Sequence, residues 1–525
     1  MPSKRITRCL LLAALPVLGL AVLLASSCAA PALARDTVRI AVLAPRGLGT
    51  LDPHFATAHY DRMAASWLHG ALVRFRPGSI SPGDIEPDLA ERWEMSPDGL
   101  TWTFFLRAGV TFHDGSPVTA DDVAFSLRKA ATPATSAYAA DFTAVDSVTV
   151  VDPATVRIVL RQPIPSLLGL LANYSGGFIL SRQALAAGGD PAAAAIGFGP
   201  FRLESQSAGQ EAASFVANDS YFRGAPRLRR IEYRFVSALS TSDLAFNAGE
   251  VDIIEGQQDQ AWINRTRQSP NTAVDVIEPA EISLLHLNVT QKPLDDPRVR
   301  RAIALAVNRP ELVSWRGKDL ARAARSVVPA GYLGFADADA PATDIAEAKR
   351  LLAEAGYPNG LTLTTIHTQN PVMLGAIQVV QAELRRAGID LDVQVVEHQT
   401  YHQMIRKDLS PVVHYAAARF PVADTMLTQF FHSRSIVATP TAVTNFSHCT
   451  VADSDLDEAR GDTDLERQLM LWSDAQRKIV AAGCAVPLLE TLQVWARRAD
   501  FDYGFAFKGS MSTGPLLTER SHFTP

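Results

Sequence analysis

The chain has 525 residues, of which 47% are hydrophobic and 20% are charged, and its formal net charge is -6. This length exceeds what a single hydrophobic core usually holds, so we expect two or three lobes. The composition is that of a globular protein, and the acidic balance argues against a nucleic-acid binder, which usually presents a basic face.

The first 34 residues differ from those that follow. Three basic residues lead into an apolar stretch over residues 9–24, and an A-x-A site ends at Ala34. This order predicts a secretory signal peptide, because roughly 16 apolar residues fall short of the ~20 that span a bilayer. The segment 25–28 also resembles a lipoprotein cleavage box, which would leave Cys28 lipidated at the new N-terminus. We therefore expect a periplasmic protein, either freely soluble or anchored through Cys28.

Two cysteines, Cys449 and Cys484, remain after cleavage behind Ala34. An exported compartment permits oxidation, and unpaired thiols are a liability outside the cytoplasm, so we expect a disulfide between them. Two buried free thiols are the alternative interpretation.

The first half of the chain contains a predicted α+β segment. Residues 37–42 alternate like a strand, and a period of two over residues 101–112 indicates another. Thr119 is placed to cap a helix with acidic residues in its first turn. Residues 148–160 then form a predicted β-hairpin. Residues 70–195 are therefore predicted to be α+β.

The second half carries a clear α/β pattern. A strand is predicted over residues 361–366, a helix over 372–387 and an alternating strand over 389–395. Strand, crossover helix and strand make a βαβ unit, whose strands are almost always parallel. A helix followed by a strand over residues 241–254 adds α/β elements nearer the N-terminus. Two α/β lobes with one inserted α+β segment follow from this order.

Motifs for catalysis are absent from the sequence. There is no G-x-S-x-G elbow, no H-E-x-x-H and no P-loop. Cysteines and histidines do not adopt metal-ligand spacing, so we expect neither a metal site nor a cofactor. The pair His113-Asp114 is interpreted as a β-turn before a helix. These observations favour binding over catalysis.

Residues 87–127 closely resemble the signature of the bacterial extracellular solute-binding family 5, which contains the dipeptide-, oligopeptide- and nickel-binding proteins of ABC importers. The matching segments read PDLAERWE, SPDGLTWTF, LRAGVTFHDG and PVTADDV. Further landmarks at 51–53, 199–201, 218–226, 249–252, 294–302 and 348–357 extend the resemblance over nearly the whole mature chain. In the signature itself, Trp102, Phe104 and Phe112 are expected to be core residues.

The resemblance implies an α/β, two-lobed, hinged periplasmic-binding-protein fold of type II, with an additional α+β domain inserted in the first lobe. In this division, lobe I comprises residues 35–69, 196–283 and 489–525, the additional domain 70–195, and lobe II 284–488. Ligand would be enclosed between the lobes as the hinge closes.

The implied function is that of the substrate-binding component of an ABC importer. It would capture a peptide-like, anionic or other small organic solute and deliver it to the permease and ATPase subunits at the membrane. A monomer without enzymatic activity and without nucleic-acid binding is expected. The alternatives are an exported ligand receptor for a signalling partner and an exported hydrolase on the same scaffold.

Peptide-binding members of the family hold the ligand's α-amino group with an aspartate in a segment of the form A-D-Y-x-x-P. The matching segment here is 418–427, and without gaps the aspartate position is occupied by Arg419. A cation there would suit a carboxylate. With a gap, Asp424 takes the role instead, and both alignments stay open.

Other candidate ligand contacts lie in neighbouring loops and strands. Phe420 and Tyr415 would offer stacking faces, as aromatic residues often do in ligand pockets. Asn445 would be a polar contact, and Arg46 lies in the loop after the first strand, where family members contact ligand. His414 is either a ligand contact or a hydrogen-bonded strand histidine. Ligands bind outside strand ends in such lobes, which is why loop residues are favoured.

Overall fold

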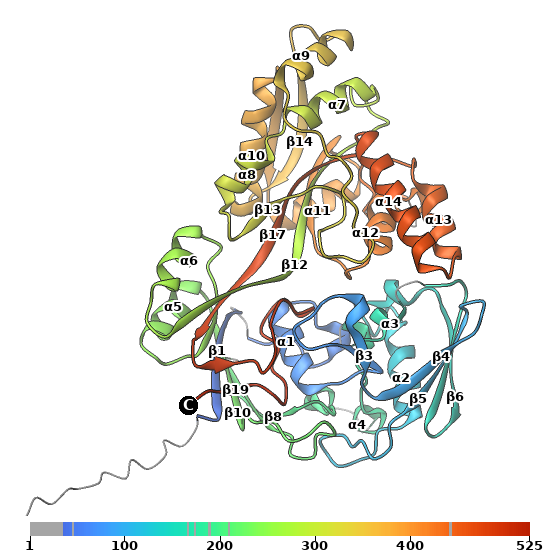
Figure 1. Cartoon of the computed structure of the whole chain (residues 1–525), viewed down its shortest axis with the longest axis vertical. Coiled ribbons are helices and arrows are strands. Elements are labelled where there is room, and N and C mark those ends of the chain that lie inside the picture. Colours follow the sequence, from blue (N-terminus) through green and yellow to red (C-terminus); the bar gives the residue numbers. More distant parts are fainter. Residues whose placement is uncertain are drawn as a thin grey trace, which may run out of the picture. The chain divides into compact units, whose positions relative to one another are not determined.

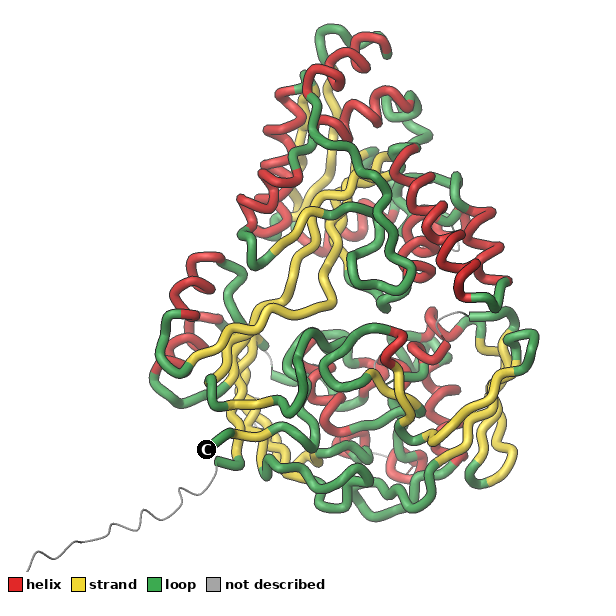
Figure 2. The backbone as a smooth tube through the Cα atoms, in the orientation of Figure 1, coloured by secondary structure: helices red, strands yellow, loops and turns green. Residues whose placement is uncertain are grey.

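Two long strands organise the computed structural model of the chain, which describes residues 35–44, 47–164, 167–172, 175–186, 191–207, 211–439 and 444–525. Residues Arg35–Thr524 form one unit. Within it, β12 (Thr272–Leu287) pairs antiparallel with β17 (Ala485–Arg498) near the middle of a sheet with 11 described strands. Figures 1 and 2 show this pair linking two groups of strands.

The first strand group lies beyond β17. Its order away from β17 is β11 (Ile253–Glu255), β1 (Thr37–Leu43), β10 (Arg230–Val236), β9 (Ala212–Ala217) and β8 (Phe201–Gln206). Strand β1 is parallel to both neighbours. Its first half alternates in burial, as the sequence pattern predicts, and Ile40, Ala41 and Val42 are all buried. The accompanying helices are α1 (His59–Leu68), α5 (Leu239–Asn247) and α6 (Gln260–Arg267). Trp67 of α1 packs edge-on against Phe215 and Tyr233, which anchors α1 on this sheet.

The second strand group lies beyond β12. Its order away from β12 is β16 (Val412–Ala417), β14 (Leu361–Thr368) and β15 (Ile389–Val396), and β13 (Ala321–Ala323) pairs with β17. Strands β14 and β15 are parallel and are joined by α10 (Pro371–Arg386), so the predicted βαβ unit is confirmed. Gly388, with φ of 91°, ends this helix in the left-handed conformation that glycine tolerates best. The remaining helices are α7 (Pro297–Ala306), α8 (Arg309–Arg316), α9 (Ile345–Glu354), α11 (His398–Arg406), α12 (Ala423–Phe431), α13 (Asp453–Gly461) and α14 (Leu465–Ala481).

A separate α+β region precedes β8. Its four-stranded sheet has the order β4 (Ala90–Met95), β5 (Thr101–Leu106), β7 (Thr155–Leu160) and β6 (Val145–Asp152). It also contains the β2 (Val73–Phe75) and β3 (Ile85–Pro87) pair and the helices α2 (Ala120–Ala130), α3 (Leu167–Leu170) and α4 (Arg182–Ala186). Helix α2 begins with a capping box between Thr119 and Asp122. Phe104 and Phe112 are buried and Trp102 stacks on Phe104, so the signature residues are scaffold, as expected.

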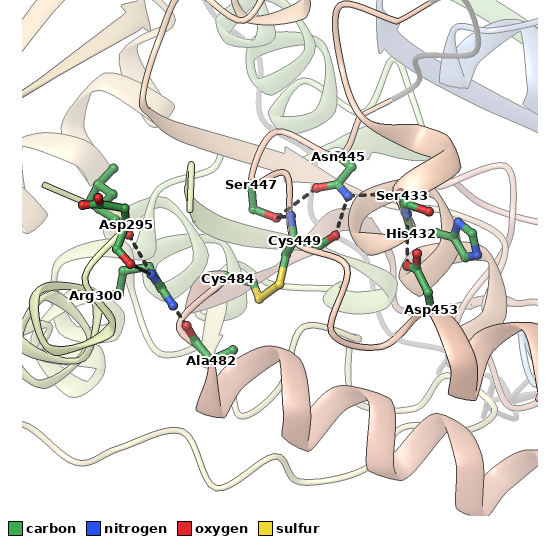
Figure 3. Close-up of a disulfide and its surroundings, with 11 residues drawn as sticks. Asp295, Arg300, His432, Ser433, Asn445, Ser447, Cys449, Asp453, Ala482 and Cys484 are labelled. Atoms are coloured by element: carbon green, nitrogen blue, oxygen red, sulfur yellow. Dashed lines mark hydrogen bonds between the residues drawn. A yellow bond between two sulfur atoms is a disulfide. The ribbon is translucent and has the colours of Figure 1, made fainter. Parts of the chain in front are cut away.

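A disulfide joins Cys449 to Cys484 in the second half of the chain. Figure 3 shows that it ties the loop before α13 to the turn between α14 and β17. Arg300 of α7 donates to the Ala482 carbonyl beside it over 2.8 Å. The short strands β18 (Phe501–Asp502) and β19 (His522–Phe523) pair near the C-terminus. None of the helices in the described ranges combines the length and apolarity needed to cross a bilayer.

Candidate functional site

The pairing of β12 with β17 changes register in the middle of the large sheet. Ile277 lies opposite Gln493, whereas Glu281 lies opposite Thr491, so β12 bulges between these pairs. A bulge bends its strand and redirects the side chains that follow it. The backbone of Glu278, within the bulge, bonds to the C-terminal segment at Lys508 and Ser510. The side chains of Glu281 and Gln493 line a cavity next to this bend.

Two adjoining cavities meet at Arg62 and Arg419. The hinge chamber, about 340 Å³, is also lined by His59, Glu255, Glu281 and Gln493. The domain chamber, about 540 Å³, lies between the α+β region and the segment 418–435. Cavities of this size suit small organic ligands, which bind in largely preformed pockets with a few placed polar groups.

Arg419 lies in the loop between β16 and α12, where the strand end delivers it to both chambers. Its Nε donates to Gln429 Oε1 over 2.6 Å, and its Nη1 donates to the Ala418 carbonyl over 2.9 Å. The guanidinium carbon is 5.2 Å from the centre of the Phe430 ring. These contacts orient the group but leave its charge without an ion-pair partner among the described residues. An anionic ligand group would supply that partner.

Arg62 brings a second guanidinium to the same place from α1. Its Nη1 donates to the Thr57 carbonyl over 3.1 Å and its Nη2 to Thr513 Oγ1 over 3.2 Å. Its Nε is buried and has no hydrogen-bond partner in the described part of the chain. A buried donor without a partner is costly, so this atom points to a group that the protein itself does not provide.

Two carboxylates face the arginines, one in each chamber. Glu281 lines the hinge chamber and Asp141 the domain chamber, and neither side chain has a hydrogen bond or an ion pair within the ranges that the structure describes. The pKa of Glu281 lies above its ordinary value because the chamber walls withdraw it from bulk water, an effect that the arginines oppose. Desolvation by the walls of the domain chamber likewise raises the pKa of Asp141, and the charge of Arg419 opposes this shift.

Asp424, the alternative partner for a ligand amine, is already paired. Its carboxylate is 4% exposed and accepts two bonds from Arg460, at 2.9 Å to Nε and 3.0 Å to Nη2. A bidentate arginine neutralises the carboxylate and occupies both of its oxygens. Asp424 therefore lines the domain chamber without offering it a free charge.

Phe420 lines the domain chamber and also joins two parts of the molecule. Its ring lies 5.9 Å from that of Phe75, in the α+β region. Its edge also lies over Gly169 of α3, where an added Cβ would come within 1.7 Å of the ring. Phe420 is thus a packing contact between the loop after β16 and the α+β region, and it forms one wall of the domain chamber.

Three other sequence-predicted contacts, Tyr415, His414 and Asn445, are buried and lie outside the linings of both chambers. Tyr415 is 8% exposed and packs against Phe430 and Phe446. His414 is hydrogen-bonded to Ser283 at 2.7 Å and to His367 at 2.9 Å, which is the strand-histidine alternative. Burial lowers the pKa of His414 to about 3, which keeps it neutral.

Asn445 has a structural environment that Figure 3 shows. Its amide donates to the carbonyls of His432 and Cys449, and its Oδ1 accepts from Ser447. Every polar atom of the side chain is thus used to hold the loop beside the disulfide, so it has no group left for a ligand. Arg46 lies outside the described residues.

Sequence reasoning missed Arg62, Glu281 and Asp141. Each belongs to a different element, and no local motif marks any of them. The sequence signal that bears on Glu281 is its place directly before the mostly apolar segment 282–287, because a charged residue there needs a partner or a polar cavity. The described residues contain no group of three or more histidine, cysteine, aspartate or glutamate side chains that could hold a metal ion.

Comparisons with known proteins agree with this architecture. The model of the bacterial extracellular solute-binding proteins, family 5, matches residues 84–437. The chain belongs to this family. The glutathione-binding protein GsiB of Salmonella choleraesuis is 30% identical over 504 residues, which cover 92% of this chain and 96% of the relative.

Solved structures of family members superimpose on nearly the whole chain. MoaA of A. tumefaciens R10, in complex with mannopinic acid, is 48% identical with a TM-score of 0.79, covering 94% of this chain and 100% of that one. AgaA of the same strain, in complex with agropinic acid, is 25% identical with a TM-score of 0.73, covering 93% and 98%. These neighbours confirm the α/β, two-lobed, hinged fold with an additional α+β domain.

As a family 5 protein, the chain is the substrate-binding component of an ABC importer. It captures a small ligand between its two lobes and delivers it to the membrane permease. The relatives named above are binding proteins, and the family is extracellular, which agrees with the predicted signal peptide and a periplasmic location.

Proposed function

We propose that the chain imports a small organic acid and that Arg419 and Arg62 bind its carboxylate. The observation that carries this proposal is the meeting of two guanidinium groups, neither paired with a carboxylate among the described residues, where the two chambers join. Two such groups attract an anion strongly and bind a carboxylate in a defined orientation. Arg419 stands where peptide-binding members have the aspartate that holds the ligand's α-amino group. This replacement supports a ligand that is bound through an acid group rather than through the amino end of a peptide.

The ligands of similar proteins support the same class. Mannopinic acid is bound by the 48% identical MoaA, and agropinic acid by the 25% identical AgaA. Glutathione, named for the 30% identical relatives, also carries carboxylates. Mannopinic acid is therefore the first compound to test, and opine-like acids are the proposed class.

Thermal unfolding and calorimetric titration with a panel of compounds test this proposal. The panel contains mannopinic acid, agropinic acid, glutathione, a dialanine peptide and mannitol. A ligand present at 100 times its Kd stabilises the folded chain by about 2.7 kcal/mol. We expect that shift from one or more of the acids and none from mannitol, with the ligand recovered at unchanged mass. Stabilisation by mannitol or dialanine alone would contradict the proposal, and conversion of the ligand would indicate an enzyme.

The lobe boundaries are part of the proposal. We place lobe I at residues 35–69, 196–283 and 489–525, the additional domain at 70–195 and lobe II at 284–488. The bulge in β12 next to residue 283 supports a hinge there, because an irregular ladder bends more readily than a regular one. The contact of Phe420 with Gly169 then joins lobe II to the additional domain, as expected for closed lobes.

The remaining details concern partners and anchoring. We propose a monomer that docks on the permease, which works with the ATPase subunits, and that does not bind nucleic acid. The N-terminus is either free after Ala34 or lipidated at Cys28, both of which lie outside the described residues. The mass of the mature protein isolated from its host distinguishes a chain that starts at Arg35 from an acylated chain that starts at Cys28.

A further inference from the structure

Glu281 is a charged residue with an unusual position in the large sheet. It follows the bulge in β12, and its side chain is accessible in the hinge chamber. The other carboxylate of this chamber, Glu255, is already engaged, because it accepts from the Leu43 amide over 3.1 Å and pairs with His59 over 3.2 Å. Glu281 therefore provides the free negative charge of the hinge chamber.

The position of Glu281 relative to the arginines selects one ligand geometry. Glu281 interacts electrostatically with both Arg62 and Arg419, whereas Asp141 interacts with Arg419. In an amino acid the ammonium group is one carbon away from the carboxylate. A carboxylate bound between the two arginines therefore places its own α-ammonium next to a residue that is near both of them. Glu281 meets this condition in the hinge chamber, which it lines together with both arginines. Asp141 lines the domain chamber with the same two arginines, of which Arg419 acts on its charge, so a variant of each carboxylate is needed to tell them apart.

We infer that Glu281 binds the protonated amine of the ligand, so that the ligand class is amino-acid-derived acids whose amine is free or alkylated and basic. This inference rests on the proposed function, since it needs the carboxylate to be bound by Arg62 and Arg419. It extends that function by excluding acids that lack a basic amine, because they would leave Glu281 facing two arginines and a neutral group. A ligand that covers this carboxylate without pairing with it leaves a desolvated charge, and that cost rejects the wrong ligand.

The pairing also links binding to protons. The pKa of free Glu281 is raised by its surroundings, and an arriving ammonium favours the ionised form, so binding near pH 5 releases protons from Glu281. The charged and titratable groups that face it are Arg62 and His59 of α1, Glu255 of β11, Arg316 of α8 and Arg419. Comparing the chain with Glu281→Gln isolates the contribution of Glu281, because these other groups are present in both proteins.

The test uses calorimetric titration of the chain, Glu281→Gln and Asp141→Asn with mannopinic acid and its N-acetyl derivative. We expect Glu281→Gln to weaken mannopinic acid binding by at least about 30-fold, the loss typical of one partner of a charge pair that binding buries. We expect Asp141→Asn, the matched carboxylate in the other chamber, to change it less than about three-fold, as for a charge that the ligand does not contact. The N-acetyl derivative should bind weakly to the chain and no more weakly to Glu281→Gln.

Titration at pH 5 in two buffers of different ionisation enthalpy supplies a second measurement. The chain should release more protons on binding than Glu281→Gln does, whereas a merely structural role for Glu281 would leave proton release unchanged. Equal affinity of the chain and Glu281→Gln for mannopinic acid would overturn the inference while leaving the proposed function intact. Failure of the unaltered chain to bind any acid of the panel would overturn both.

Discussion

Replacing Gly169 with alanine should hold the two lobes apart. Gly169 has no left-handed backbone angle, so alanine fits its conformation, but the added Cβ would lie 1.7 Å from Cζ and 2.4 Å from two further carbons of the Phe420 ring. Gly169 belongs to the additional domain and Phe420 to lobe II in the proposed division. The clash therefore exists in the closed form and disappears when the lobes separate.

The size of the effect follows from the cost of overpacking. Inserting a methyl group into a packed contact typically costs about 1–3 kcal/mol, which is roughly a 5- to 150-fold change in an equilibrium constant. Because only the closed form encloses the ligand, the apparent affinity for mannopinic acid falls in proportion to the remaining population of the closed form. Gly169→Ala should thus weaken mannopinic acid binding by a factor in that range and slightly change the thermal stability of the free protein.

Two further variants make this prediction specific. Gly461→Ala, at the end of α13, has no atom within 4 Å of the added Cβ and should bind as the unaltered chain does. Adding Phe420→Ala to Gly169→Ala removes the clash and should restore part of the affinity. Calorimetric titration measures all three. Unchanged affinity of Gly169→Ala, or no recovery in the double variant, would refute the closure contact.

Three more predictions concern the ligand, acid pH and the disulfide. Arg419→Ala should weaken the binding of acid ligands by roughly 30-fold or more, measured by calorimetry, and unchanged affinity for mannopinic acid would contradict its role. Three buried histidines have pKa values of about 3 in the folded chain, below the ordinary 6.5. As the pH falls below 6.5, these histidines become protonated in the unfolded chain but stay neutral in the folded chain, so the free energy of unfolding decreases. The three histidines are His69, His286 and His414. Each should cost about 2 kcal/mol of stability at pH 5, and denaturant unfolding at pH 7 and 5 that gives equal free energies would contradict this. Replacing Cys449 and Cys484, 35 residues apart, with serine should lower the unfolding free energy by roughly 4 kcal/mol in urea titrations, and no change would show that the crosslink does not stabilise the fold.

Local patterns predicted the elements of the fold well. The alternation of residues 389–395, the capping box of Thr119 and the glycine after α10 each depend on neighbours within a few residues. The order of elements predicted two α/β lobes, but the boundaries of the lobes came from the family resemblance, because β12 pairs with β17 across about 200 residues of sequence. No periodicity within one segment encodes that pairing.

The candidate site was harder to predict for the same reason. Arg419 was found because a family motif marks its loop, but Arg62 and Glu281 join it from distant elements. Asn445 and Tyr415 lie near family landmarks. However, the Asn445 amide donates its hydrogen bonds to backbone carbonyls, and the Tyr415 ring packs against other aromatic rings. Residue type alone does not reveal whether the protein already satisfies a polar or aromatic side chain. Asp424 is the clearest case, since its partner Arg460 is 36 residues away.

Small-angle X-ray scattering of the purified chain, with and without saturating mannopinic acid, tests lobe closure on a guest molecule directly. Enclosure of the acid should lower the radius of gyration, and Gly169→Ala should need a roughly 5- to 150-fold higher acid concentration to reach the lower value. A radius of gyration that stays the same at calorimetrically verified saturation would contradict capture by closing lobes.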